Sequence, residues 1–416
     1  MTENEIELNE REKALLISVD SGDFDAEVSM EELTLLAQTA DACVVSTVIQ
    51  KKSSPDAGTF IGSGKLNEIT EFCKNNEIEV IIADGELTPS QQKNLERETD
   101  VRVIDRTTLI LDIFARRAKS GEGKLQVSLA QLEYALPRLG GKGVSLSRLG
   151  GGIGTRGPGE SKLESDRRHI RRRITALKAE LSSLDERRGR YRERRRKDGI
   201  RTVALVGYTN AGKSTLMNAL TDAGVIAEDK LFMTLDPTAR ALKLPCGASV
   251  MLIDTVGFVR RLPHGLVEAF KSTLDEARDA DVILNVCDAS SAYCYEQMTV
   301  TNDTLREIGC EGKPVITVLN KCDLVSDLFS LPVIGQSVHI SARTGEGLDK
   351  LLEMAERALP ETHRRVKLLL PYSELGCASA LRRDGTVHSE EYVGDGLLLD
   401  VTADAASLDR LRDYIV

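Results

Sequence analysis

The sequence has no tryptophan and few aromatic residues of any kind, since aromatic residues make up only 4% of the chain. This disfavours a protein that holds single-stranded nucleic acid by stacking bases on aromatic side chains. No apolar run approaches the roughly 20 residues that a membrane-spanning helix requires. The first residues, MTENEIELNERE, are acidic and lack the apolar core of a signal peptide. We therefore expect a cytoplasmic protein with no integral membrane segment.

Paired cysteine motifs are also missing. Eight cysteines are scattered along the chain without a C-x-x-C pair. This pattern argues against a zinc site or a disulfide framework and favours reduced thiols. The chain of 416 residues is 41% hydrophobic and 29% charged, which is ordinary for a protein of roughly two to four domains. Nothing in it indicates an obligate oligomer, so we expect a monomer.

The net charge argues against a nucleic-acid partner, but its distribution does not. The formal charge is −10, yet basic residues outnumber acidic ones more than twofold between Lys162 and Lys197, with arginine clusters at 171–173 and 194–196. A local basic face matters more for binding than the overall sum. RNA contact through this segment is therefore predicted, whereas nothing points to DNA.

Residues 1–120 predict an N-terminal α/β subdomain. Short β-branched runs alternate with helical stretches, which is typical of a mostly parallel sheet. The expected strands are 14–19, 43–49, 80–83 and 101–104, and the expected helices are 30–39, 65–75 and 90–98. A GSGK sequence at 62–65 hints at phosphate binding, but it lacks the spacing of a phosphate-binding loop.

Residues 121–198 predict a long antiparallel helical hairpin. Leucine and isoleucine recur at heptad spacing in two stretches, one from Leu125 to Leu136 and one from Leu163 to Leu184. The loop between them, 138–161, is rich in glycine and basic residues. Such a tip can approach a phosphate backbone closely, although a mobile solvent loop is the alternative. The candidate RNA-binding residues are Arg138, Lys142, Arg148 and Arg156.

Residues 199–362 predict a doubly wound α/β domain, whose ligands bind at the carboxyl ends of the strands. Residues 363–416 predict a small C-terminal α+β domain with two strands, VKLLLPY and GLLLDVTA, and two helices, SELGCASALRR and SLDRLRDYI. Nothing in this last domain carries recognisable chemistry.

The sequence GYTNAGKS at 207–214 matches G-x-x-x-x-G-K-[ST] between a predicted strand and a predicted helix. In that context, backbone N–H groups surround the β-phosphate at a helix N-terminus. Lys213 should bridge the β- and γ-phosphates, and Ser214 should ligate Mg²⁺. Asp254 opens a D-x-x-G sequence that supplies a second acid for Mg²⁺ and, at Gly257, an N–H for the γ-phosphate.

Two further segments predict a preference for guanine. In Asn320-Lys321-Cys322-Asp323 a carboxylate can accept hydrogen bonds from guanine N1–H and the 2-amino group, which adenine does not offer in that geometry. Ser341-Ala342 would place a backbone N–H on guanine O6. All four segments follow predicted strands of one domain in the order that a guanine-nucleotide domain requires.

The chain resembles translation-factor-class GTPases and, within them, the HflX family. The resemblance is carried by LFMTLDPTAR, DTVGFVRRLPHGLVEAFKSTLDE, DRTTLILDIFARRAKSGEGKLQVSLAQLEYALPRL and GGGIGTRGPGESKLESDRRHIRRRI, and it covers about residues 14–359. It implies a P-loop GTPase that binds the large ribosomal subunit and splits stalled or idle ribosomes, notably under heat stress. It also implies insertion of the 140–159 loop toward the peptidyl-transferase rRNA. Use of ATP by the N-terminal domain is implied too, although no motif there explains it.

The resemblance assigns the switch threonine to Thr234, with Thr238 as the alternative. Lys213, Thr234 and Gly257 are the catalytic candidates, and Ser214, Thr234 and Asp254 are the metal candidates. GTP or GDP would contact Gly207, Tyr208, Thr209, Asn210, Ala211, Gly212, Lys213, Ser214, Thr215, Phe232, Thr234, Asp254, Gly257, Asn320, Lys321, Asp323, Ser341, Ala342 and Arg343.

Phe258 stands where many GTPases have a water-orienting glutamine, so intrinsic hydrolysis should be slow. Asn210 stands where an asparagine ligates K⁺ in potassium-stimulated GTPases; a hydrogen bond that fixes the loop is the alternative. Two other functions stay open, a large-subunit assembly GTPase and a GTP-gated RNA-binding protein with negligible turnover.

Overall fold

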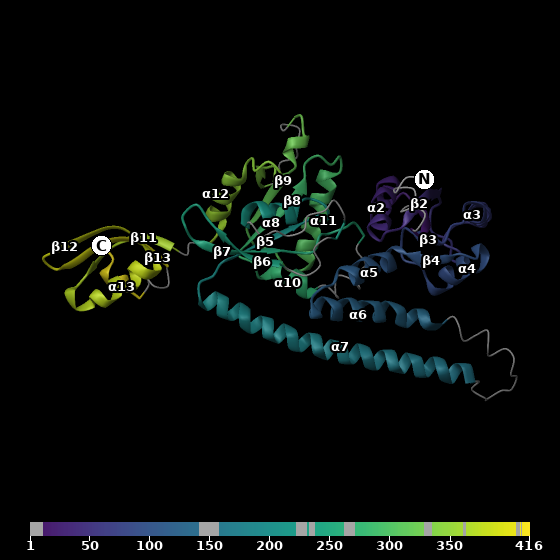
Figure 1. The fold of residues 1–416 in the computed structure, drawn as a ribbon, viewed down its shortest axis with the longest axis horizontal. Coiled ribbons are helices and arrows are strands. Elements are labelled where there is room, and N and C mark those ends of the chain that lie inside the picture. Colours follow the sequence, from purple (N-terminus) through teal and green to yellow (C-terminus); the bar gives the residue numbers. More distant parts are fainter. Residues whose placement is uncertain are drawn as a thin grey trace.

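The computed structural model describes residues 11–140, 158–221, 231–232, 238–261, 271–327, 335–360, 363–404, 408 and 410–416. Three separate sheets and one long helical hairpin make up the described chain (Figure 1). This confirms the predicted fold class. None of the helices in the described ranges combines the length and apolar character needed to cross a membrane.

The N-terminal sheet has four parallel strands in the order β2-β1-β3-β4. Side chains alternate across β1: Ala14 and Leu16 face one core with α2 and α5, whereas Leu15 and Ile17 face another with α3 and α4. Its elements are β1 (Lys13–Asp20), α2 (Ala26–Thr39), β2 (Cys43–Lys51), α3 (Ser63–Asn76), β3 (Val80–Ala83), α4 (Pro89–Thr99), β4 (Arg102–Asp105) and α5 (Arg106–Arg117).

A helical hairpin follows, made of α6 (Gly121–Ala135), the short turn η1 (Leu136–Gly140) and α7 (Pro158–Lys197). The 40 residues of α7 span about 60 Å at 1.5 Å per residue. The two helices lie side by side (Figure 1) and are joined by ion pairs between Lys178 and Glu133 (2.7 Å) and between Arg188 and Glu122 (2.9 Å). In Figure 1 the hairpin runs beneath both α/β domains.

The central sheet has six strands in the order β10-β9-β8-β5-β7-β6, and all of the neighbours except β6 and β7 are parallel. Apolar runs on both faces of β5 and β8 explain why these strands lie at the centre, buried between helices. The elements are β5 (Thr202–Gly207), α8 (Lys213–Thr221), β6 (Thr238–Lys243), β7 (Ser249–Asp254), α10 (Lys271–Asp279), β8 (Val282–Asp288), α11 (Cys294–Glu307), β9 (Val315–Asn320), η3 (Cys322–Leu324), β10 (Gln336–His339) and α12 (Leu348–Ala358).

The C-terminal unit is an antiparallel sheet of three strands in the order β11-β13-β12, with α13 packed on one face. It extends from the central domain on the side away from the N-terminal sheet (Figure 1). Its elements are β11 (His363–Leu370), η5 (Tyr372–Glu374), α13 (Leu375–Asp384), β12 (Thr386–Val393), β13 (Gly396–Asp404) and η6 (Arg412–Tyr414). Strand β12 was not predicted, because its side chains are mostly exposed and polar.

Candidate functional site

The phosphate-binding loop joins the end of β5 to the start of α8, at the carboxyl edge of the central sheet. Gly207 has φ +147°, and a Cβ there would lie 2.1 Å from the carbonyl oxygen of Val286 on the neighbouring strand β8. Gly212 has φ +93°, and a Cβ there would lie 2.3 Å from Asn320 Nδ2. Both glycines of the motif are thus required by close approach of neighbouring groups.

Lys213 begins α8 and points back along the loop. Its Nζ donates to the carbonyl oxygens of Gly207 (3.0 Å) and Tyr208 (2.9 Å). The residue is only 7% exposed, and this burial lowers the pKa of its ammonium group to about 8, although the Asp254 carboxylate opposes the shift. A cation held in this way inside the loop is suited to bind phosphate oxygens.

The predicted metal ligands meet beside the loop. Ser214 Oγ donates to Asp254 Oδ2 at 3.0 Å, and Asp254 is fully buried at the end of β7. Hydroxyl and carboxylate oxygens are the ligands that Mg²⁺ prefers, so this pair fits the ion. Thr234 lies outside the described residues. Thr238, its alternative, opens β6 and pairs in register with Asp254.

The segment after Asp254 runs along the phosphate-binding loop. A Cβ at Gly257 would lie 2.9 Å from Thr209 Cα and 3.0 Å from Lys213 Nζ, so Gly257 packs directly on the loop. The Phe258 amide donates to Gly207 O (3.0 Å), and Phe258 O accepts from the Thr209 amide (2.8 Å). The Phe258 ring is buried in the hydrophobic cluster that includes Val206 and Leu274. Its phenyl group therefore anchors this segment in the core.

The two guanine segments lie at the ends of β9 and β10. Asn320 Nδ2 donates to Ala211 O, and Asn320 Oδ1 accepts from the Ala342 amide, each at 2.9 Å. Asn320 thus ties the phosphate-binding loop to the 341–342 segment. Here the Ala342 amide holds Asn320, whereas the sequence predicted an N–H from this segment on guanine O6. Lys321, with φ +63°, pairs with Asp288 at 2.7 Å.

Asp323 lies in η3 with an exposed side chain, as the recognition of a base edge requires, and Arg343 is also exposed. Ser341 is buried and its hydroxyl accepts from the Thr344 amide at 3.2 Å, which fixes the turn. Ala211 is buried, whereas Ser214 and Thr215 are partly exposed on the first turn of α8. Asn210, with φ +61°, lines a cavity of about 410 Å³ together with Thr39 and Leu231.

Two predicted nucleotide residues direct their side chains elsewhere. The Phe232 ring is buried in the N-terminal core, with its centroid 4.6 Å from that of Phe114 in an edge-to-face contact. The Tyr208 side chain leaves the loop and donates its hydroxyl to Glu32 on α2. Sequence reasoning missed Glu32 as a neighbour of the loop, because no motif joins residues so far apart in the chain.

Arg138, predicted to contact RNA, makes several contacts within the N-terminal domain. Its guanidinium lies 3.4 Å from the centroid of the Tyr134 ring. It also donates to the carbonyl oxygens of Tyr134 and Leu87, both at 2.9 Å, and pairs with Asp105 at 3.5 Å. The residue follows directly on α6 and folds back over it. Lys142, Arg148 and Arg156 lie outside the described residues.

The GSGK sequence begins α3. The Gly62 amide donates to Gln50 Oε1 at 2.8 Å, and Lys65 pairs with Glu68 at 2.5 Å. These contacts stabilise the start of α3. The implied use of ATP by the N-terminal domain stays a prediction.

Three family models match consecutive parts of the chain. They are described as GTP-binding GTPase N-terminal (residues 27–115), GTP-binding GTPase Middle Region (117–195) and 50S ribosome-binding GTPase (202–321). Among solved structures, the chain is similar to a GTP-binding protein from the hyperthermophilic archaeon Sulfolobus solfataricus in complex with GDP. The two are 29% identical with a TM-score of 0.45, over 83% of this chain and 98% of that one.

Curated relatives named GTPase HflX match over most of their length. The protein from Caldanaerobacter subterraneus is 48% identical over 98% of this chain and 94% of its own. The Escherichia coli protein is 42% identical over 87% of this chain and 86% of its own. Likeness at this level across all the folded parts extends well beyond the nucleotide motifs, and this chain therefore belongs to the HflX family of GTPases, enzymes that bind and hydrolyse GTP.

Proposed function

We propose that this GTPase binds the large ribosomal subunit and splits stalled or idle ribosomes into subunits in the cytoplasm, notably under heat stress. The observation that carries the proposal is α7, a 40-residue helix that links the GTPase domain to the basic 138–161 loop. Its arginines at 171–173 and Arg190 are exposed. A stiff basic arm of this kind is suited to contact rRNA phosphates. The description of the matching family model, 50S ribosome-binding GTPase, supports the same partner.

We assign the hydrolytic step to Lys213, Thr234 and Gly257, and Ser214, Thr234 and Asp254 would hold Mg²⁺. When bound, Mg²⁺ would supply positive charge that stabilises the phosphate oxygens during hydrolysis. Phe258 cannot orient the attacking water, because its ring is buried in the core. We therefore expect slow intrinsic turnover, which a ribosomal surface would accelerate.

K⁺ is the candidate for an additional cation at Asn210. Rates measured in KCl and in NaCl at equal ionic strength test this assignment, and equal rates would remove it. ATP at the N-terminal domain is tested by titrating ATP in the presence of saturating GDP, which blocks the guanine site.

The proposed function is tested by GTP turnover with and without purified ribosomes, alongside sedimentation of the same mixtures. Strong stimulation with nucleotide-dependent loss of intact ribosomes is expected. Stimulation by large subunits without splitting would favour an assembly GTPase, and nucleotide-dependent RNA binding with negligible turnover would favour a GTP-gated binding protein. Arg148 and Arg156 are the variants to make next, with Arg138 as a control for a structural arginine.

A further inference from the structure

A buried charged cluster lies where the N-terminal sheet would ordinarily bind a ligand. Asp84 directly follows β3, Arg106 begins α5 after β4, and Glu32 lies on α2. Arg106 pairs with Asp84 at 3.0 Å and with Glu32, and all three side chains are buried. In an open parallel α/β sheet, the carboxyl ends of the strands form the usual ligand crevice. Here that crevice is filled from the GTPase domain.

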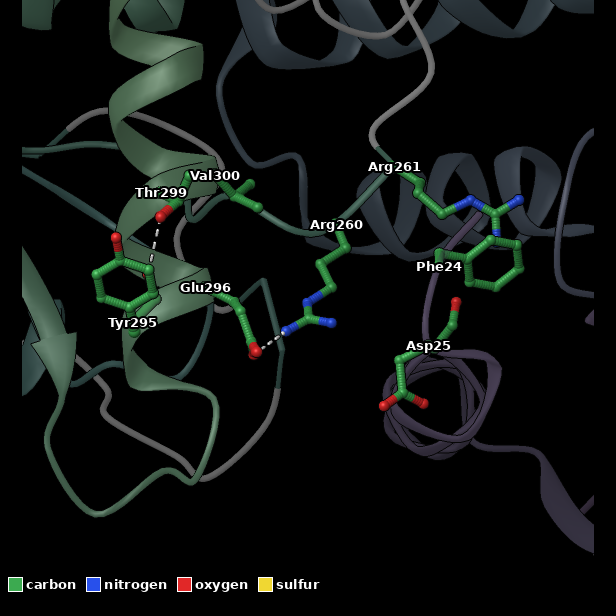
Figure 2. A pocket seen from close by; sticks show the side chains of 9 residues that line it. Phe24, Asp25, Arg260, Arg261, Tyr295, Glu296, Thr299 and Val300 are labelled. Atoms are coloured by element: carbon green, nitrogen blue, oxygen red, sulfur yellow. Dashed lines mark hydrogen bonds and ion pairs between the residues drawn. The ribbon is translucent and has the colours of Figure 1, made fainter. Parts of the chain in front are cut away.

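The occupant is the segment that follows Gly257. Arg261 reaches Asp84 Oδ2 at 3.3 Å, and its guanidinium lies 4.1 Å from the centroid of the Phe24 ring (Figure 2). Arg106 donates to the carbonyl oxygen of Arg260 at 3.2 Å. Arg261 has φ +52°, a backbone conformation that residues other than glycine rarely adopt. The N-terminal domain thus holds both the backbone and a side chain of this segment.

The Tyr208 hydroxyl joins this cluster to the phosphate-binding loop. It donates to Glu32 and accepts from the Arg260 amide at 2.7 Å. Burial and the nearby Glu32 carboxylate raise the pKa of Tyr208, so the hydroxyl stays a proton donor. One side chain of the loop therefore ties the residues after Gly257 to the N-terminal domain. We refer to the contacts of Tyr208, Arg260 and Arg261 with Glu32, Asp84 and Arg106 as the tether.

The tether is anchored next to the γ-phosphate position. Gly257 packs on Lys213, where a Cβ would lie 3.0 Å from Nζ, and the backbone bonds of Phe258 to Gly207 and Thr209 hold it there. The β-phosphate, which GDP and GTP share, would be held by loop N–H groups and by Lys213. The γ-phosphate, which only GTP carries, would lie beside Gly257, where this segment packs on Lys213. GTP would therefore require the segment to shift, whereas GDP would not.

We propose that Tyr208 and Arg261 are positioning residues that set the selectivity of the enzyme between GTP and GDP. The tether favours the conformation in which Gly257 lies on Lys213. Its free energy opposes binding of the triphosphate and leaves binding of the diphosphate unaffected, because only a ligand with different affinity for two conformations shifts their balance.

Beside the tether, open space lies between the N-terminal domain and α11. A cavity of about 420 Å³ separates Phe24 and Asp25 at the start of α2 from Tyr295 and Val300 on α11, with Arg260 and Arg261 beside it (Figure 2). At this point the residues after Gly257 contact the N-terminal domain, whereas α11 is separated from it by the cavity. Movement of that segment would therefore be transmitted to α2 through Tyr208 and Glu32.

The test uses the full-length protein and compares the dissociation constants of GDP and a non-hydrolysable GTP analogue, both with Mg²⁺. Tyr208→Phe removes one hydroxyl and keeps the ring in its apolar cluster. It should tighten binding of the GTP analogue relative to GDP by roughly 3- to 10-fold, the effect of one hydrogen-bonded group. Arg261→Gln, which does not touch the loop, should shift the ratio in the same direction.

Tyr134→Phe is the matched control, because Tyr134 also bonds a buried carboxylate, Asp105, but within the N-terminal domain. It should leave the ratio of the two dissociation constants unchanged even if the melting temperature falls. An unchanged ratio in folded Tyr208→Phe, or one shifted toward GDP, overturns the proposal. Should Tyr208→Phe fail to fold, Arg261→Gln decides by the same ratio.

Discussion

At the scale of single residues, the phosphate-binding loop requires glycine at position 207, because there is no space for a Cβ. Gly207 lies against the backbone of β8, and a single added methyl group would meet a carbonyl oxygen that cannot move without disrupting the sheet. Gly309 also has positive φ (+79°), but a Cβ there would meet nothing within 4 Å. The two positions separate backbone strain from steric conflict.

Gly207→Ala should lower the free energy of unfolding by about 2–4 kcal/mol, because it combines overpacking with a strained backbone. Gly309→Ala should lower it by only about 1 kcal/mol, the cost of the left-handed conformation alone. Urea unfolding of both variants measures the difference, and equal losses would show that the contact with β8 relaxes freely.

Lys213 should make nucleotide affinity depend on pH. Burial lowers the pKa of its ammonium group to about 8 from the ordinary 10.5, and phosphate oxygens bind the charged form. GDP affinity should therefore be constant below this pKa and fall as the pH rises through it, since binding then requires proton uptake. Calorimetric titration in two buffers of different ionisation enthalpy, at about pH 7 and about pH 9, measures the protons taken up. No uptake at the higher pH would contradict the assignment.

The residues that sequence reasoning located well are those fixed by short-range chemistry. Gly207, Lys213 and Ser214 lie in one loop and Asn320 at one strand end, so a motif and its flanking strands suffice to place them. The directions of Tyr208, Phe232 and Arg138 were not predictable, because each is set by partners distant in the chain or by packing: Glu32, Phe114 and the Tyr134 ring. A buried aromatic inside a phosphate-binding motif carries no local sign of the domain that it faces.

At the scale of elements, the strand alternation predicted both parallel sheets, whereas the antiparallel β6 was missed. Its TARALK sequence has mostly exposed side chains and lacks the apolar run of a buried strand. Of the predicted helix at 407–415, the described residues show helix at Leu408 and the short turn η6 at Arg412–Tyr414. Strand β6 forms because its pairing with β7 outweighs the local preference of its residues.

The segment that continues from β7 to Phe258 should not tolerate the glutamine that many GTPases have at the Phe258 position. Phe258→Gln would bury an amide among Val206, Tyr208 and Leu274, at a cost of about 2–4 kcal/mol in unfolding free energy. Intrinsic GTP turnover should not rise, because the side chain faces the core. A faster, fully stable variant in a single-turnover assay would contradict this view of the segment.

The end of α7 forms ion pairs with α10, the first helix that the structure describes after the Gly257 segment. Arg192 pairs with Asp279 at 2.6 Å and lies 3.8 Å from Glu276, and Arg195 lies 3.6 Å from Glu276. We expect this junction to transmit the effect of a partner bound at the far end of the hairpin to the GTPase domain.

Arg192→Gln should reduce the stimulation of GTP turnover by ribosomes, while basal turnover stays within about twofold, because Arg192 lies far from the phosphates and loses only partly exposed pairs. Arg187→Gln, an exposed change five residues earlier in α7, is the control. Equal stimulation in both variants would show that α10 takes no part in the response.

At the scale of the whole molecule, the N-terminal and GTPase domains share a hydrophobic core. Leu231, Phe232, Val256 and Val259 of the GTPase domain belong to the same buried cluster as Leu33 and Phe114. The C-terminal unit has its own core around Leu368 and Leu399. The boundaries that sequence composition suggests between residues 120 and 199 therefore do not separate independent packing units.

The shared core has a consequence for anyone who shortens this protein. A truncated chain that begins near residue 199 would present the four apolar side chains from Leu231 to Val259 to water, and such a patch favours self-association. Calorimetry of the intact chain should show the N-terminal and GTPase domains melting together and the C-terminal unit melting separately. Kinetic constants measured on an excised GTPase domain would then come from a protein with an exposed apolar patch, which the intact enzyme keeps covered.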